Sequence, residues 1–136
     1  MSRVFADTHF FIALLSSRDA QHAKAVEVYS GQDFEEIVTT AWILSELADG
    51  MNRIHARSQC HRFIQRLRQR RDTRIVEAER ELFWRGFDLY GKRQDKEWSL
   101  TDCISFVVMA DERLTAALTN DHHFDQAGFI VLLPRD

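Results

Sequence analysis

The sequence predicts an α/β fold, a parallel sheet covered by helices on both faces. Segments with the pattern of strands alternate with segments of helical period along the whole chain, as in βαβ units. The strand candidates are uninterrupted apolar runs, which suits a sheet that is buried on both faces. The 136 residues include 45% hydrophobic ones and no repeat or linker, so we expect one domain, residues 1–136.

Apolar periodicity and turn residues locate the elements of the first half. A short apolar run precedes Asp7, and apolar residues at helical spacing follow it. Residues 37–39 are β-branched, which favours a strand. The most regular helix follows, with an apolar stripe from Ile43 to Ile54. In chain order we expect strand 4–6, helices 8–15 and 21–29, a stop at 30–33, strand 37–39, and helices 42–57 and 58–71.

The second half continues the alternation. Residues 103–110 are apolar nearly all round, as in a helix buried in the middle of a domain. Gly128 closes a short helical turn, and Pro134 ends the last strand. In chain order we expect strand 74–76, helix 77–90, a charged loop at 91–97, the buried helix after Asp102, strand 116–119, the turn at 122–128 and strand 129–133.

Large apolar side chains are expected to pack in the core, because most aromatic residues serve packing. Trp98 stands in the charged loop near Asp102 and could instead stack on a base. The other side chains expected to be buried or to pack are Trp42, Phe63, Ile64, Leu67, Leu82, Phe83, Trp84, Phe87 and Leu89.

Composition excludes several classes of protein. No apolar run approaches the roughly 20 residues of a membrane span, and the amino terminus lacks the pattern of a signal peptide. Cys60 and Cys103 form no CxxC pair, and free thiols fit a reducing cytoplasm. We therefore expect a cytoplasmic protein with no membrane partner.

The net charge of −3 gives no overall signature of nucleic-acid binding, but its distribution is uneven. Residues 53–74 carry +7, so the rest of the chain carries −10. Such polarity could place a phosphate-binding face beside an acidic pocket, although an arginine-rich helix can also be a solvated face. The candidate RNA-binding side chains are Arg53, Arg57, Arg62, Arg66, Arg68 and Arg70.

Four carboxylates are expected at one edge of the sheet. Asp7 and Asp121 each follow a short apolar strand, and open α/β sheets place their functional crevice outside the carboxyl ends of the strands. Asp102 stands at the amino end of the buried helix, and Glu46 lies near the first turn of a helix that follows another strand. Gathered carboxylates repel one another unless a cation compensates them. The pattern therefore predicts a pocket for a hard divalent cation, which suits hydrolysis of phosphodiester bonds.

Each acid also has a simpler structural explanation. Asp7 and Asp121 could be helix N-caps. Asp102 could complete a capping box with Ser99, because Ser-x-x-Asp before an apolar run has that form. Glu46 could be a residue at the solvent edge of its helix. Helix capping would explain the positions of Asp7, Asp102 and Asp121. It would not explain why the acids are expected at the same edge of the sheet.

Four stretches of the chain resemble the acidic motifs of PIN-domain ribonucleases. They are FADTHFFIALL with Asp7, TTAWILSELADGM with Glu46, WSLTDCISFVVM with Asp102 and LTNDHHFDQAGF with Asp121. The resemblance covers essentially the whole chain and is closest to the VapC-like toxins of bacterial toxin–antitoxin pairs. His122-His123 is a small departure from the family pattern, which leaves the role of His122 open.

The resemblance implies a three-layer α/β/α sandwich whose five parallel strands have the order 3-2-1-4-5. It implies an endoribonuclease that depends on Mg²⁺ or Mn²⁺, cuts structured RNA, forms a homodimer and is silenced by a cognate antitoxin. Matched residue by residue, Asp7, Glu46, Asp102 and Asp121 are the catalytic and metal-binding acids; Thr8 and Thr119 position water or metal; and Asp125 is an outer ligand or an exposed acid.

Other functions remain open at this stage. A receiver-like signalling domain would accept a phosphoryl group on an aspartate, but it needs a cation after a late strand, and no lysine follows Leu118 or Leu133. An idle PIN-like binding module would have lost its acids, whereas all four are present. A transition-metal site of His122, His123 and Asp125 is a further alternative to surface imidazoles.

Overall fold

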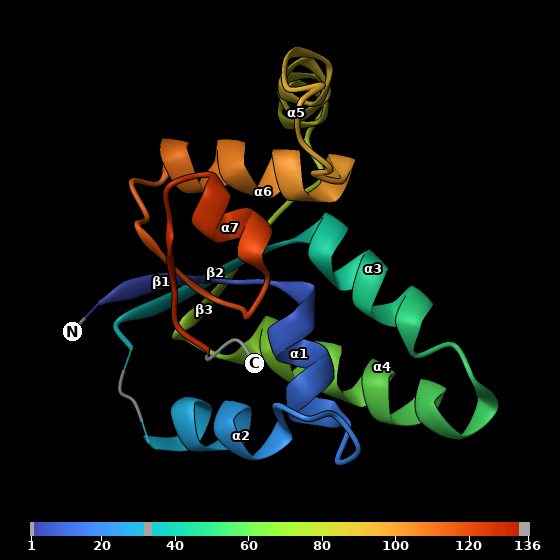
Figure 1. The fold of residues 1–136 in the computed structure, drawn as a ribbon. Coiled ribbons are helices and arrows are strands. Elements are labelled where there is room, and N and C mark those ends of the chain that lie inside the picture. Colours follow the sequence, from blue (N-terminus) through green and yellow to red (C-terminus); the bar gives the residue numbers. More distant parts are fainter. Residues whose placement is uncertain (1, 32–33, 134–136) are drawn as a thin grey trace.

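The computed structural model describes residues 2–31 and 34–133 and shows a five-stranded parallel sheet between helices (Figure 1). The strand order, β3-β2-β1-β4-β5, confirms the expected order and fold class.

In Figure 1, α1, α2 and α4 lie below the sheet, α6 and α7 lie above it, and α5 stands beyond α6. The elements are β1 (Arg3–Ala6), α1 (Thr8–Leu15), α2 (His22–Gly31), β2 (Glu36–Thr40), α3 (Ala41–Gly50), α4 (Ile54–Gln69), β3 (Thr73–Val76), α5 (Arg80–Lys92), α6 (Leu100–Asp111), β4 (Ala116–Leu118), α7 (His122–Gln126) and β5 (Ile130–Val131).

The centre of the sheet fixes where the chain turns into its helices. In β1, Phe5 lies between Val38 of β2 and Ala117 of β4. The backbone N–H of Asp7, just after β1, donates to the carbonyl of Leu118 at 3.2 Å. Because parallel strands end at the same edge, the residues that follow β1 and β4 are side by side.

The buried helix α6 is held between the sheet and α5. Phe106 of α6 contacts Phe124 of α7 edge to face, with ring centroids 5.0 Å apart. On its other side, α6 approaches α5 so closely that a Cβ on Gly86 would lie 2.3 Å from the Ile104 side chain. The amino end of α6, which carries Asp102, is therefore fixed by packing on two sides.

The expected helix 42–57 is wrong in its extent. Helix α3 ends at Gly50, and α4 begins at Ile54. Met51 caps α3 through its N–H to the carbonyl of Ala48, and the chain then turns back. Ile54, expected on the buried stripe, is 92% exposed because it lies in the first turn of α4, beyond the end of α3.

Two side chains of α5 also depart from expectation. Phe87 and Trp84 are 47% and 50% exposed, since α5 packs chiefly against α6 and its outer side has no further layer over it. The expected packing role of Trp98 is confirmed, because it is buried and its ring contacts Phe106 edge to face at 5.0 Å.

The remaining differences are at element ends. The last strand, expected at 129–133, covers only Ile130–Val131. The expected stop by Pro134, and the Gln32-Asp33 part of the earlier stop, lie outside the described residues. Over the ranges that the structure describes, no helix is long and apolar enough to cross a membrane.

Candidate metal centre

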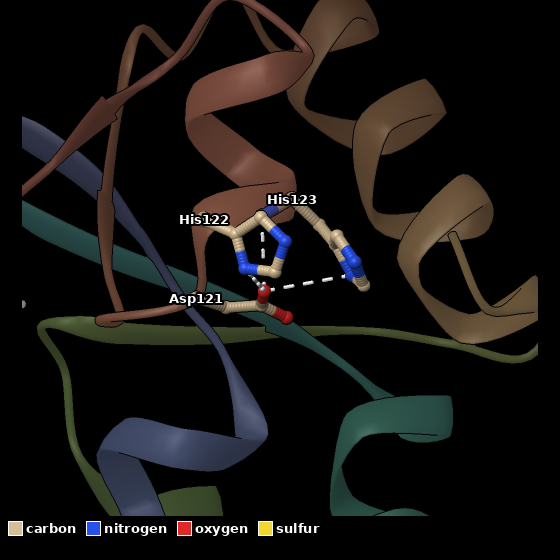
Figure 2. A group of neighbouring side chains, drawn as sticks. All are labelled: Asp121, His122 and His123. Atoms are coloured by element: carbon tan, nitrogen blue, oxygen red, sulfur yellow. Dashed lines mark hydrogen bonds and ion pairs between the residues drawn. The ribbon is translucent and has the colours of Figure 1, made fainter. Parts of the chain in front are cut away.

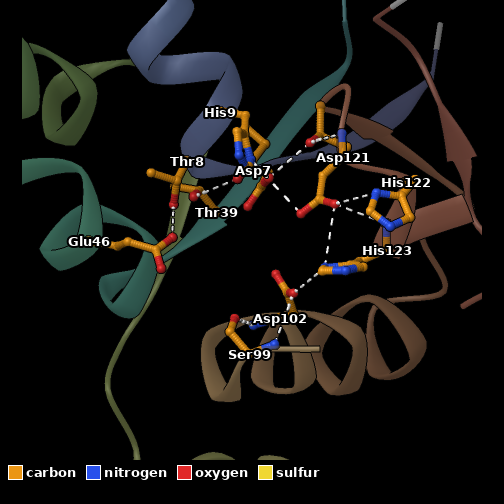
Figure 3. A network of polar contacts seen from close by, with 12 residues as sticks. Asp7, Thr8, His9, Thr39, Glu46, Ser99, Asp102, Asp121, His122 and His123 are labelled. Carbon is orange, nitrogen blue, oxygen red and sulfur yellow. Dashed lines mark hydrogen bonds and ion pairs between the residues drawn. The ribbon is translucent and has the colours of Figure 1, made fainter. Parts of the chain in front are cut away.

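Asp7 lies at the centre of the candidate site, at the carboxyl end of β1. Its side chain is buried, with the residue only 2% exposed, and it does not cap α1. Instead, Asp7 Oδ2 accepts a hydrogen bond of 2.8 Å from the Thr119 hydroxyl and lies 3.0 Å from His9 Nδ1. The N-cap explanation of this carboxylate is therefore wrong, and the carboxylate lies beside His9 and Asp121 (Figure 3).

Asp121, after β4, faces Asp7 across the strand ends. Its Oδ1 accepts from the backbone N–H of His123 at 2.9 Å, so Asp121 does cap α7. Its own N–H donates to the Thr119 hydroxyl at 3.1 Å. His9 Nδ1 is 4.0 Å from Asp121 Oδ2. Thr119 and His9 thus each connect the two aspartates.

Asp102 enters the site from the first turn of α6. The expected capping box is present: Asp102 N–H donates to Ser99 Oγ at 3.0 Å, and Ser99 N–H donates to Asp102 Oδ2 at 3.1 Å. The same Oδ2 is 3.1 Å from His123 Nδ1. Burial raises the pKa of the Asp102 carboxyl, and the charges of Asp7 and Asp121 add to this effect. The capping explanation of Asp102 is correct, and the carboxylate also contacts His123 of the cluster.

Glu46 lies at the exposed rim of the site, on α3. It accepts a hydrogen bond of 2.5 Å from the Thr8 hydroxyl. Since Thr8 directly follows Asp7, this bond joins α3 to the start of α1 (Figure 3). The structure therefore brings the four predicted acids to one edge of the sheet, with Thr8 and Thr119 between them.

His9 was not predicted as a site residue. Its hydrogen bond to Asp7 raises its pKa from 6.5 to about 9, and the charges of Asp7, Asp121 and Asp102 act in the same direction, against the opposing effect of burial. At neutral pH the imidazole is therefore a cation among carboxylates. The sequence feature that could have indicated His9 is its position, two residues after Asp7 in the first turn of a helix.

His123 was considered only with His122 and Asp125. Figure 2 shows both imidazoles beside Asp121, at 3.7 Å for His122 Nδ1 and 3.5 Å for His123 Nδ1. Asp121, His122 and His123 form one group with the spacing of metal ligands, and Asp7, His9 and Asp121 form another. Asp125 is exposed and belongs to neither group, so its role as an outer ligand remains a prediction.

The arginines of the basic span lie away from this cluster. All six candidates are exposed on α4 or at its ends, and α4 lies on the face of the sheet opposite α6 and α7. Arg70 is engaged by Asp72 and lies over the Tyr29 ring, with its guanidinium carbon 5.1 Å from the ring centroid. Their role in RNA binding remains a prediction.

The donor set fits a hard divalent cation. Asp7, Asp102, Asp121 and Glu46 supply carboxylate oxygens, which such ions prefer. Burial, followed by the charges of Asp7 and Asp121, raises the pKa of the Asp102 carboxyl, and a bound cation would favour its ionised form. The site is therefore an acidic cluster able to hold a metal ion.

Fold and site define a class: an α/β protein whose carboxylates meet at the carboxyl edge of a parallel sheet, where they could hold a divalent cation. The sequence model of the PIN domain matches residues 4–130, and the chain belongs to the PIN-domain family. The expected family is thereby confirmed.

Similar proteins agree with this assignment. The chain is 27% identical over 135 residues to the 23S rRNA-specific endonuclease VapC20 from two strains of Mycobacterium tuberculosis, covering 96% of this chain and 98% of that protein. The crystal structure of VapC20, described as a sarcin–ricin loop cleaving toxin, has a TM-score of 0.86 at 24% identity and covers 96% of this chain and 99% of that one. These matches confirm the expected class, a VapC-like endoribonuclease of the PIN-domain family.

Two further structures share the fold. FitAcB from Neisseria gonorrhoeae has a TM-score of 0.66 at 17% identity, covering 96% of both chains. VapBC2 from Rickettsia felis, bound to a DNA fragment from their promoter, has a TM-score of 0.66 at 12% identity and covers 96% of this chain and 97% of that one. Family membership leaves the receiver-like alternative without support.

Proposed function

We propose that the acidic cluster is the catalytic site of this endoribonuclease and that Asp7, Glu46, Asp102 and Asp121 hold Mg²⁺ or Mn²⁺. The observation that carries the proposal is the convergence of Asp7, Asp121 and Asp102, from three separate elements, around His9 and His123. Bound there, a divalent cation supplies Lewis-acid charge for the phosphate and lowers the pKa of a water.

The chain's own residues orient this site. The Thr119 hydroxyl holds Asp7 at one oxygen, which leaves the other oxygen of Asp7 for a ligand. Ser99 fixes the Asp102 carboxylate through its backbone N–H, and Thr8 holds Glu46 at the rim. Attack by water in line with the leaving oxygen would leave 5′-phosphate and 3′-hydroxyl ends, with no role for the 2′-hydroxyl.

Substrate and partners follow from the similar proteins. VapC20 is named for cutting 23S rRNA and the sarcin–ricin loop, so we infer a structured RNA as substrate. The exposed arginines of α4 supply positive charge for its backbone. A cognate antitoxin, a homodimer, a cytoplasmic location and one domain over residues 1–136 complete the proposal.

Cleavage of RNA by the purified protein tests it. Wild type should cut purified ribosomal RNA in Mg²⁺ or Mn²⁺ and not in EDTA, and Asp7→Asn and Asp102→Asn should lose this activity. Asp88→Asn, an exposed acid on α5, is the matched control and should cut like wild type. Cutting by folded Asp7→Asn and Asp102→Asn at the wild-type rate would contradict the proposal.

A further inference from the structure

A cleft lies beside the acidic cluster, between the end of α5 and the start of α6. Its volume is about 810 Å³, inside the range of roughly 300–1,000 Å³ typical of ligand pockets. The side chains that matter to its chemistry are Phe87, Tyr90, Arg93, Lys96, Trp98 and Ser99.

Two aromatic rings of the cleft are exposed without serving the core. Phe87 is 47% exposed and touches Trp84 at its edge. Tyr90 is 50% exposed and makes no ring contact with another aromatic residue of the described chain. Trp98, by contrast, is already occupied, because it packs on Phe106 and its ring lies 5.0 Å from the Arg93 guanidinium carbon. The free stacking surface of the cleft is therefore on α5.

Ser99 connects the cleft to the candidate metal centre. Ser99 lines the cleft, and its backbone N–H also donates to Asp102 Oδ2 at 3.1 Å. Figure 3 shows Ser99 and Asp102 together at the amino end of α6. If a metal ion at Asp102 held one RNA phosphate, a neighbouring nucleotide would lie near Ser99, at the edge of the cleft.

The charges of the lining suit a nucleotide. Arg93 is paired with Asp95 through hydrogen bonds of 3.0 and 3.1 Å, which leaves Lys96 as the cation of the lining that is not held by this pair; Glu97 is the acid of the lining. Cationic side chains beside exposed aromatic rings are the arrangement that binds unstacked bases of single-stranded nucleic acid. We propose that this cleft binds one unstacked base next to the cleaved phosphate, with the base on the Tyr90 ring and Lys96 near the backbone. The inference rests on the proposed function and adds a specificity site to it.

A matched pair of variants on α5 tests the cleft. Tyr90 and Trp84 are equally exposed on one helix, but only Tyr90 lines the cleft. Ends of purified ribosomal RNA cut by wild type in Mg²⁺ are mapped by sequencing, and a 12-nucleotide RNA spanning the main cut is then used as the probe. Tyr90→Ala should raise KM about tenfold, the size expected for one lost stack, and should relax the preference for one base beside the cut. Tyr90→Phe should behave like wild type, and so should Trp84→Ala.

The outcomes separate the alternatives. Equal KM and base preference in Tyr90→Ala and Trp84→Ala would overturn the inference while the endonuclease assignment stands. Conversion of a dimer to a monomer by Tyr90→Ala, measured by sedimentation, would also overturn it, because a second copy of the chain would then cover this face. Wild type that leaves the RNA intact in both Mg²⁺ and Mn²⁺ would overturn the proposed function itself. Should Tyr90→Ala fail to fold, Phe87→Ala takes its place with the same expected results.

Discussion

The Thr119 hydroxyl donates a 2.8 Å hydrogen bond to Asp7 Oδ2, although the two residues are 112 positions apart in the chain. The same hydroxyl accepts from the N–H of Asp121 at 3.1 Å. One buried side chain therefore joins the carboxylate of Asp7 to the backbone of Asp121, across the ends of neighbouring strands.

Replacing Thr119 with valine should expose this role. Thr119→Val keeps the shape of the side chain but leaves the Asp121 N–H without its acceptor, which should lower the free energy of unfolding by about 1–3 kcal/mol. Affinity for Mg²⁺ should fall as well, since Asp7 loses its fixed orientation. Urea unfolding and calorimetric titration with Mg²⁺ would measure the two effects. Thr115→Val, at an exposed position, is the control; an equal loss in both variants would refute a special role for Thr119.

Asp102→Asn should separate metal binding from stability. The folded protein raises the pKa of the Asp102 carboxyl, so in the metal-free state its ionised form costs stability, and stability should rise as the pH falls through that raised pKa. Asparagine removes the charge but keeps an oxygen that can accept from Ser99. In EDTA the variant should therefore be at least as stable as wild type. In Mg²⁺ only wild type should gain in Tm, because only wild type binds the ion tightly. A similar Tm gain in Asp102→Asn would exclude this acid as a ligand.

His9 should report directly on the charge of the cluster. Its pKa is raised to about 9, first by its hydrogen bond to Asp7. A raised pKa of a base stabilises the fold fully below its ordinary value of 6.5, and this contribution is lost as the pH rises through about 9. NMR titration of metal-free protein should show the high pKa, and Asp7→Asn or added Mg²⁺ should lower it. An unchanged His9 pKa in Asp7→Asn would contradict the contact as the cause.

How far the sequence predicts this site depends on the residue. Asp7 and Asp121 could be located because each follows an apolar strand, and strand ends are visible in the local pattern. His9 and His123 could not, because their place among the acids depends on how α1 and α7 are oriented over the sheet. The sequence indicated only that each histidine lies two residues after an aspartate, His9 after Asp7 and His123 after Asp121.

The fold, too, has features that the sequence predicts and features that depend on packing between elements. The strand order was implied by the resemblance to PIN-domain ribonucleases, which rests on four acidic motifs spread over the whole chain. The break between α3 and α4 was missed because Gly50 to Arg53 contain no proline, and the apolar stripe continues to Ile54 in register. Exposure of Trp84 and Phe87 could not be read from periodicity, since an amphipathic pattern does not tell how wide the partner of a helix is.

The arginines of α4 can be tested by their dependence on salt. If Arg66, Arg68 and Arg70 contact RNA phosphates, replacing all three with glutamine should weaken binding and flatten the salt dependence by about 0.7 per lost contact for single-stranded RNA. Binding of a labelled RNA to Asp7→Asn protein, with and without the three changes, would be measured from about 50 to 200 mM salt. Replacement of Arg80 and Arg113, exposed elsewhere, is the control. An unchanged slope would assign this face to a partner or to solvent.

Gly86 links the packing of α5 to the position of Asp102. A Cβ at this residue would lie 2.3 Å from Ile104 Cγ1 and 3.0 Å from Ile104 Cα, so the backbone of α6 itself would have to move. Gly86→Ala should lower the free energy of unfolding by about 1–3 kcal/mol, although alanine favours the helix by about 1 kcal/mol. Gly91→Ala, near the end of the same helix, has nothing within 4 Å of the new Cβ and should be neutral or stabilising.

The pair also tests whether α6 acts as the rigid support of the site. Asp102 is two residues before Ile104, so a shift of α6 away from α5 should move the Asp102 carboxylate relative to Asp7 and Asp121. RNA cleavage at a temperature where both variants remain folded should then fall in Gly86→Ala and stay at the wild-type level in Gly91→Ala. Full activity in a destabilised Gly86→Ala would contradict this role, because it would show that Asp102 keeps its place without the close packing of α6 on α5.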